Sequence, residues 1–413
     1  MSIIPTPIIM VKNGILLLLF MLGCVILVGF QLIIGFIFKN SPGHKHDGIG
    51  LTKTYFVQMM AFFHANASPN KISITYDSKK LPEGNEFTVN GFNDLQGILS
   101  PNSIIISNHQ IYTDWLYVWF LLYTSKLSST IHIILKDLSK VPILGYGMRN
   151  YNFLFLSRKW EQDKVILTNQ LLAIDANARG SGPANGIVHT QSTNITNGVG
   201  DVKVWPNQNI SKDLYPYTIV LYPEGTVPSL RTTKKSKEYC EQVGKPILNH
   251  VLLPRVRGLY LSLLNLRNSV SVVYDITTGY SGLKEKEFGE DIYTLKNVFL
   301  RGKGPKQVNY HIRAFNISEI PLGADVLDID QVKEDDLKRF EDWLFKVWYE
   351  KDELMDTFYK YGKFITSDDP NFDTYKTVVA DMKLRSVLEL TPVVSFALIL
   401  FYLIGKIFKF IFG

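Results

Sequence analysis

The stretch SIIISNHQIYTDWLYVWFLL (residues 103–122) places one histidine and one aspartate between two apolar runs. The first run, 103–107, is short and β-branched, as is typical of a buried strand, and the second, 114–123, is long enough for a helix. On one continuous helix, His109 and Asp114 would point about 140° apart. A strand, a turn and a helix would instead let the chain fold back. We therefore predict a strand–turn–helix unit in which Asp114 orients the His109 imidazole as a general base.

Short β-rich runs and helical runs alternate through the middle of the chain. This alternation predicts an α/β fold with a mostly parallel sheet flanked by helices. Strands are expected at residues 71–76, 103–107, 130–135, 153–157, 218–222, 269–274 and 308–315, and helices at 114–123, 160–174, 234–243, 257–266 and 334–349. Residues 176–213 are rich in Gly, Asn, Ser and Thr, so we expect a flexible surface insertion there.

The N-terminal end of the 413-residue chain is strongly apolar. Residues 14–38 contain no charged side chain and are long enough to cross a hydrocarbon core of about 30 Å, so they predict a transmembrane helix. A cleaved signal peptide is the alternative, but the run ends at bulky residues 36–38 rather than at a small-residue cleavage site. Residues 51–64 are aromatic and too short to span, and we expect them to lie under the lipid headgroups.

A second apolar segment lies at the C-terminal end. Residues 390–405 are apolar, and Lys406 and Lys409 follow among aromatic and aliphatic residues. This segment either spans the bilayer with snorkelling lysines or lies in the interface as an amphipathic anchor, and the sequence leaves both open. The predicted organisation is an N-terminal anchor (1–66), a central domain (67–385) and a C-terminal membrane segment (386–413).

The charge and the cysteine content of the chain indicate what the protein binds and in which compartment its central domain lies. The net charge of +6 suits an anionic membrane surface or phosphate-bearing ligands, whereas lysines scattered this evenly argue against nucleic-acid binding. More lysines follow the N-terminal apolar helix than precede it, so the positive-inside rule places the central domain in the cytosol. Cys24 and Cys240 alone build no disulfide framework, which agrees with that location. The sequence lacks paired metal-ligand spacing such as H-E-x-x-H, so we expect no metal site.

The segment YPEGT (222–226) places polar residues directly after a predicted strand. Gly225 permits a tight turn between Glu224 and Thr226, and the exposed amides of such a turn can bind an anion. A plain strand-to-loop turn is the competing interpretation.

The segment FLFLSR (153–158) delivers Arg158 to the carboxyl end of another predicted strand. Ligands of α/β proteins usually bind at that edge of the sheet, and a planar guanidinium matches phosphate. An ordinary surface pairing of Arg158 with Glu161 is the alternative.

Four segments resemble, in order, the four sequence blocks of the glycerolipid acyltransferase family: NHQIYTD (108–114, the NHx₄D signature), FLFLSR (153–158), YPEGT (222–226) and LLPRVRGL (252–259), with Pro254 as the matching proline. Three further segments are similar to the branch of this family that acts on lysophosphatidylinositol and lysocardiolipin: SKVPILGYGM (139–148), YDITTGYSG (274–282) and FEDWLFKVWYEKDELMDTFY (340–359).

The resemblance implies transfer of a fatty acyl group from acyl-CoA, a co-substrate rather than a cofactor, to a free glycerol hydroxyl of a lysophospholipid. His109 would take the hydroxyl proton, and Asp114 would fix the imidazole tautomer. The absence of a G-x-S-x-G elbow and of a cysteine near His109 agrees with direct transfer. The substrate-binding residues implied by the resemblance are Asn108, Arg158, Glu224, Gly225, Thr226 and Pro254, of which Arg158, Glu224 and Gly225 would hold the phosphate end of the acceptor.

One departure from the family pattern bears on the acceptor. Many members that use lysophosphatidic acid carry Arg directly after EGT, whereas this chain has Val227. A phosphomonoester carries nearly two negative charges and a phosphodiester carries one, so a site with one guanidinium fewer suits a diester such as lysophosphatidylinositol. Arg231, Lys234 or Lys235 could replace the missing charge.

The expected function is acylation of lysophosphatidylinositol in phospholipid remodelling, at the endoplasmic reticulum membrane with the catalytic domain facing the cytosol. The same-class alternative is a 1-acylglycerol-3-phosphate acyltransferase that makes phosphatidic acid. The alternative of another class is a non-catalytic lipid-binding or tethering protein that has kept the fold. Intact His109, Asp114 and Glu224 favour the enzyme, because a pure binder needs no general base.

Overall fold

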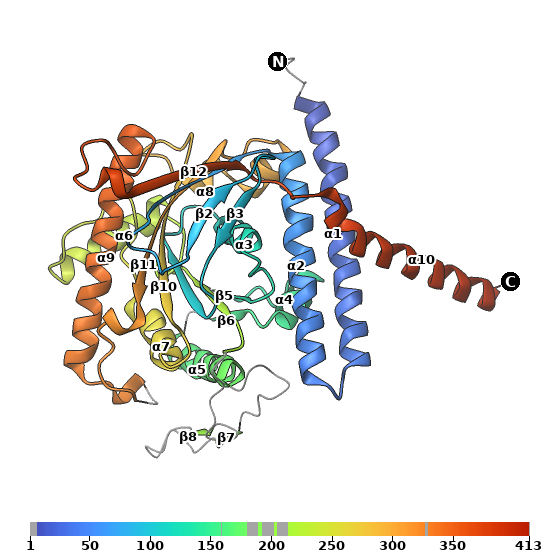
Figure 1. The fold of residues 1–413 in the computed structure, drawn as a ribbon, viewed down its shortest axis with the longest axis horizontal. Coiled ribbons are helices and arrows are strands. Elements are labelled where there is room, and N and C mark those ends of the chain that lie inside the picture. The colour runs from blue at the N-terminus through green and yellow to red at the C-terminus, as the bar shows by residue number, and fades with distance from the viewer. Residues whose placement is uncertain are drawn as a thin grey trace.

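An eight-stranded sheet runs through the centre of the structure, a computed structural model that describes residues 6–157, 159–179, 189–191, 202–204, 214–326 and 329–412 (Figure 1). The strands lie in the order β12 (Tyr375–Asp381), β1 (Lys71–Asp77), β11 (Gln307–Asn316), β10 (Val272–Tyr280), β4 (Ser103–Ser107), β9 (Thr218–Leu221), β5 (Ile131–Lys136) and β6 (Leu154–Leu156). The β12–β1 and β10–β11 pairs are antiparallel, and the other pairs are parallel. The prediction of a mostly parallel α/β sheet is confirmed.

Helices cover both faces of this sheet because successive strand residues point to opposite sides. In β4, Ile105 packs into a core with α3 (Asp114–Thr124) and α2 (Pro42–Ala67). Its neighbours Ile104 and Ile106 pack into a second core on the other face, formed with α5 (Trp160–Arg179), α7 (Val256–Leu266) and α9 (Glu334–Tyr361). The carboxyl end of β4 therefore lies between two layers of helices.

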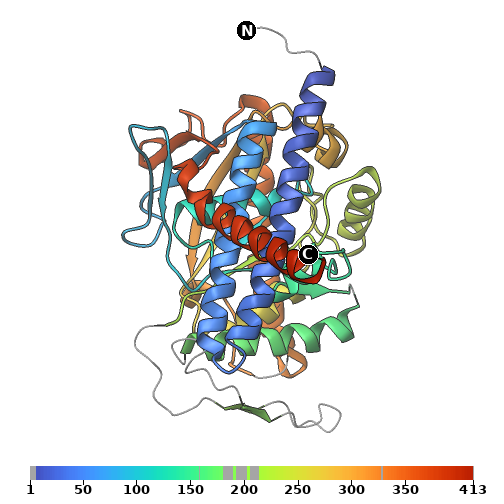
Figure 2. The same ribbon diagram turned by 90° about the vertical axis from the view of Figure 1, so that its right-hand side faces the viewer.

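The N-terminal helix α1 (Thr6–Ile37) contains most of the predicted transmembrane segment and lies beside α2 along one side of the domain (Figure 2). Buried polar residues fix α1 at two points. Asn13 Nδ2 donates to the carbonyl of Leu300 at 3.2 Å, and Asn150 Nδ2 donates to Gln31 Oε1 at 2.9 Å. The opposite face exposes large apolar residues such as Leu18 and Phe36.

Residues 51–64, expected under the lipid headgroups, form the second half of α2 and are mostly buried inside the protein. Val57 and Ala61 pack into the core shared with α3, and the ring of Phe63 stacks on Phe20 of α1 at 5.4 Å. This expectation is corrected, since packing between α1, α3 and the sheet accounts for the apolar character of the segment.

The C-terminal helix α10 (Thr391–Phe412) projects away from the body and exposes apolar side chains along its length (Figure 1). It continues through Lys406 and Lys409, so its 22 residues extend about 33 Å. Among the described residues, two segments are long and apolar enough to cross a membrane, namely α1 and residues 387–410.

Several elements were not predicted or differ in extent. The edge strand β12 was missed because it buries little, and β10 runs to Tyr280 instead of ending at Tyr274. Helix α5 ends at Arg179, so the insertion predicted at 176–213 begins later, and most of it lies outside the described residues. The smaller elements are β2 (Glu86–Val89), β3 (Leu95–Ile98), α4 (Leu144–Asn150), β7 (His189–Gln191), β8 (Val202–Val204), α6 (Leu230–Gln242), α8 (Gly289–Ile292) and the π-helical turn η2 (Lys296–Leu300).

Candidate active site

The predicted strand–turn–helix unit brings His109 and Asp114 into contact. Strand β4 ends at Ser107 and α3 begins at Asp114, so the intervening loop reverses the chain. His109 Nδ1 lies 2.8 Å from Asp114 Oδ2. The contact expected from the sequence is therefore confirmed.

Four donors hold the Asp114 carboxylate, whose side chain is only 1% exposed. Besides the imidazole, the backbone N–H groups of Gln110 and Ile111 donate at 2.6 and 3.2 Å. The hydroxyl of Tyr280, at the end of β10, donates to Oδ1. These donors replace water around a buried carboxylate and fix both of its oxygens.

The imidazole of His109 packs against protein atoms on one side and is accessible to solvent on the other. Its ring stacks on Tyr222, with centroids 4.5 Å apart and planes inclined by 27°. The side chain remains 19% exposed. Because Nδ1 donates its proton to Asp114, Nε2 carries the lone pair, and it makes no hydrogen bond within the described part of the chain.

Asn108 was expected to bind substrate, and its side chain pairs with the backbone of a neighbouring strand. Its Oδ1 accepts from the backbone N–H of Thr278 at 2.7 Å, and its Nδ2 donates to the carbonyl of the same residue at 3.0 Å. The side chain is fully buried. Asn108 therefore joins the end of β4 to β10 directly before His109, and its part in substrate binding stays a prediction.

The YPEGT segment forms a tight turn beside the histidine. The N–H of Gly225 donates to the carbonyl of Tyr222 at 2.9 Å, and Gly225 has φ +70°, which favours glycine. A Cβ at this position would lie 3.3 Å from Nε of Arg255. The backbone N–H of Arg255 donates to the Pro223 carbonyl at 2.8 Å, so an exposed guanidinium lies against the turn.

Glu224 is buried in this turn, with only 3% of its surface exposed. The indole N–H of Trp348 donates to Oε1 at 3.4 Å, whereas Oε2 is buried and has no hydrogen-bond partner among the described residues. Burial raises the pKa of Glu224 well above its usual range. The nearby backbone N–H of His109, the indole N–H of Trp348 and the charge of Lys351 oppose that rise in pKa.

The other predicted residues lie as follows. Thr226 is half-buried at the end of the turn, and Pro254 is buried directly before Arg255. Val227 is 3% exposed, so its side chain points into the protein. Arg158 lies outside the described residues. Within the described ranges, no three His, Cys, Asp or Glu side chains gather as a metal site.

Comparisons with known proteins agree with this geometry. Residues 86–244 match the Acyltransferase family, and residues 298–382 match the Acyltransferase C-terminus family. The chain is 40% identical to the 2-acyl-1-lysophosphatidylinositol acyltransferase of Saccharomyces cerevisiae over 97% of each protein. The chain belongs to the glycerolipid acyltransferase family. An uncharacterised acyltransferase of the same yeast is 33% identical over 84% of this chain and 80% of that protein. A probable 1-acyl-sn-glycerol-3-phosphate acyltransferase 5 of Arabidopsis thaliana is 27% identical over 66% of this chain and 56% of that protein.

In this acyltransferase, besides Tyr222, which stacks on His109, five further described residues outside the predicted set build the site: Arg255, Thr278, Tyr280, Trp348 and Lys351. Arg255 stands in the LLPRVRGL segment directly after Pro254, so the sequence contained a signal for it. Thr278 and Tyr280 lie beyond the predicted end of their strand, and the other two come from a helix far along the chain, although all four stand in the segments YDITTGYSG and FEDWLFKVWYEKDELMDTFY that are similar to the family branch. Their positions arise from tertiary contacts that no local pattern encodes.

Proposed function

We propose that the protein transfers a fatty acyl chain from acyl-CoA to the free glycerol hydroxyl of lysophosphatidylinositol. The observation that carries the acyl-transfer step is the contact of His109 Nδ1 with Asp114, which leaves Nε2 open. Nε2 takes the hydroxyl proton as the oxygen attacks the thioester carbonyl carbon. The tetrahedral intermediate then collapses, the C–S bond breaks, and the imidazolium returns the proton to sulfur, which yields the ester and CoA.

The charge beside the turn supports a phosphodiester acceptor. Val227 is buried at the position where many family members that use lysophosphatidic acid carry an arginine, and the exposed Arg255 guanidinium lies against Gly225. Arg231, Lys234 and Lys235 lie on α6, and Lys234 is within 3.8 Å of Glu238. We therefore assign the phosphate contact to Arg255, whose one charge matches a diester. The relative that is 40% identical over 97% of the chain is named for the same acceptor.

The proposed setting is the endoplasmic reticulum membrane, with the catalytic domain facing the cytosol and acyl-CoA as the only co-substrate. The exposed apolar faces of α1 and α10 support membrane attachment, because such surfaces avoid water. A two-tailed product would then leave directly into lipid. No cofactor is required by the proposed steps, since proton transfer and the thioester supply the chemistry.

An acceptor panel tests this proposal. We expect the purified full chain, given one acyl-CoA, to acylate lysophosphatidylinositol with a higher kcat/KM than lysophosphatidic acid. Scintillation counting of radiolabelled product after lipid extraction measures both rates. A preference for lysophosphatidic acid would instead support the phosphatidic acid-forming alternative, and binding of lysolipids without any transfer would support the tether.

Replacing Arg255 with glutamine is expected to raise KM for lysophosphatidylinositol by about 10-fold or more, because a hydrogen bond to a charged group contributes roughly 1.5–3 kcal/mol. KM for acyl-CoA should change little. The matched control is Arg257→Gln, since that guanidinium lies over the Trp160 ring at 5.6 Å rather than against the turn. Equal KM values of the two variants for lysophosphatidylinositol would show that Arg255 does not contact the acceptor.

A further inference from the structure

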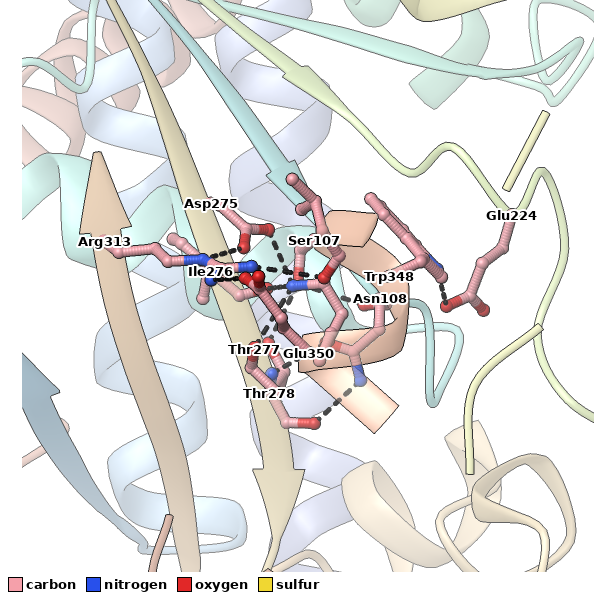
Figure 3. A network of polar contacts seen from close by, with 12 residues as sticks. Ser107, Asn108, Glu224, Asp275, Ile276, Thr277, Thr278, Arg313, Trp348 and Glu350 are labelled. Atoms are coloured by element: carbon pink, nitrogen blue, oxygen red, sulfur yellow. Dashed lines mark hydrogen bonds and ion pairs between the residues drawn. The ribbon is translucent and has the colours of Figure 1, made fainter. Parts of the chain in front are cut away.

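Helix α9 passes behind the active-site turn and presents Trp348 to Glu224 (Figure 3). Trp348 is fully buried, and its indole N–H donates to Glu224 Oε1 at 3.4 Å. This helix lies in the region that matches the Acyltransferase C-terminus family, more than 100 residues after the turn. The C-terminal region therefore contacts a residue of the EGT segment directly.

One turn further along α9, Lys351 is 0% exposed and forms an ion pair of 2.7 Å with Asp275, which is also 0% exposed. Its Nζ also donates to the carbonyl of Ile276 at 2.7 Å. The same Nζ lies 5.2 Å from the centre of the Trp348 ring. A cation at that distance polarises the indole, so Lys351 supports the N–H that Trp348 donates to Glu224.

A second cation completes the network around Asp275. Arg313 of β11 donates to Asp275 Oδ2 through Nε at 2.8 Å, and it also contacts Glu350 of α9 (Figure 3). The Asp275 carboxylate is thus shared between two cations, and β10, β11 and α9 are locked together at one point. This point lies three residues before Thr278, which holds Asn108.

Anchoring α9 to the sheet does not require these charges. The helix already buries apolar residues such as Phe340, Leu344 and Phe358 in the core of that face. A buried ion pair adds little stability compared with apolar residues of the same size, because both charges lose their hydration. The network reaches Glu224 through Trp348, which indicates a function at the active site.

We propose that Trp348 and Lys351 are positioning residues for acyl transfer, which hold the Glu224 carboxyl group so that Oε2 accepts a hydrogen bond from a hydroxyl of the acceptor lipid. This inference rests on the proposed function. Oε1 is occupied by the indole, and Oε2 is buried with no hydrogen-bond partner in the described structure. A buried carboxylate oxygen without a donor is costly, so an incoming hydroxyl would find a site ready to bind it.

The first test is Trp348→Phe in the full-length protein, which keeps an aromatic ring and removes the N–H. We expect kcat/KM for lysophosphatidylinositol to fall about 10-fold, in line with one hydrogen bond to a charged group, while KM for acyl-CoA stays unchanged. The donated hydrogen bond favours the ionised carboxyl, so its loss raises the pKa of Glu224. The acidic limb of the pH–rate profile should therefore move to higher pH.

The matched control is Trp343→Phe on the same helix, since Trp343 packs on Phe315 and Phe340. This variant should keep the wild-type kinetics and pH profile, and a cooperative melting curve shows that each variant is folded, with a lower melting temperature expected for Trp348→Phe because it leaves a cavity and an unpaired buried oxygen. Equal losses in the two variants, or an unshifted profile for Trp348→Phe, would overturn the inference. Wild-type enzyme that acylates no lysophospholipid would instead overturn the proposed function, so the two failures are distinguishable.

A second variant tests the lysine without leaving an unpaired charge. The double variant Lys351→Met with Asp275→Asn removes both members of the pair. We expect a folded protein whose acceptor kcat/KM falls at least as far as that of Trp348→Phe, with the acidic limb shifted in the same direction. A folded double variant with wild-type kinetics would show that Lys351 has no role in positioning Glu224. If the double variant does not fold, Trp348→Phe still tests the role of Trp348.

Discussion

Replacing His109 with alanine is expected to lower kcat for acyl transfer by about 10²–10⁴-fold, which is the usual contribution of a positioned general base. The loss should fall on the chemical step, because the imidazole Nε2 is the group that takes the acceptor proton. KM for both substrates should change little. The rate of product formation with lysophosphatidylinositol and one acyl-CoA measures the effect.

The fold should survive this substitution. The His109 side chain is partly exposed, and Asp114 keeps its backbone donors at Gln110 and Ile111 together with Tyr280. Circular dichroism melting should therefore match the wild type. His44→Ala is a suitable control, since His44 lies in the first turn of α2 and its imidazole forms a hydrogen bond with Ser41 rather than with Asp114. Full activity of a folded His109→Ala variant would contradict the general-base role and favour the tether.

The strand–turn–helix unit could be predicted because its signals are local. The apolar run 103–107 and the helical run 114–123 differ in length and residue type, and only a turn between them brings a histidine and an aspartate five positions apart into contact. The mostly parallel sheet followed from the same alternation of short strands and helices. These features depend on near neighbours in sequence, which a single sequence displays.

The residues that hold His109 and Asp114 in place could not be predicted in the same way. Thr278 and Tyr280 flank Gly279, which weakens a strand prediction, yet pairing with β11 extends β10 through it. Lys351 belongs to a polar stretch of α9, and a lysine there is normally solvated. Lys351 can be buried because it forms an ion pair with Asp275, which lies 76 residues earlier in the chain.

One expectation erred because composition was interpreted without tertiary packing. Residues 51–64 are apolar since they fill the space between α1, α3 and the sheet, and a membrane interface would have demanded the same residue types. Asn108 precedes the histidine in the family motif, which suggested contact with substrate. Its amide also continues the pairing of β4 with β10 beyond the last strand residue, a contact that the motif alone did not indicate.

The substitution Asp114→Asn is expected to lower kcat on the order of 10⁴-fold, because it changes which nitrogen of His109 carries the proton. An amide NH₂ directed at Nδ1 would make that nitrogen the acceptor, so the proton moves to Nε2 and the base is lost. The amide also has one oxygen where the carboxylate has two, and four donors converge there. Kinetics with lysophosphatidylinositol and a melting curve separate the catalytic from the structural effect.

Tyr280→Phe is the variant that makes this test decisive. It removes one donor to Asp114 Oδ1 and leaves the carboxylate and the histidine tautomer unchanged. Its loss should stay near one hydrogen bond to a charged group, roughly 10- to 100-fold. A loss for Asp114→Asn no larger than this would mean that the carboxylate only anchors the loop, and the base would then be sought elsewhere. A loss a hundred times larger would identify control of the imidazole tautomer as the main task of Asp114.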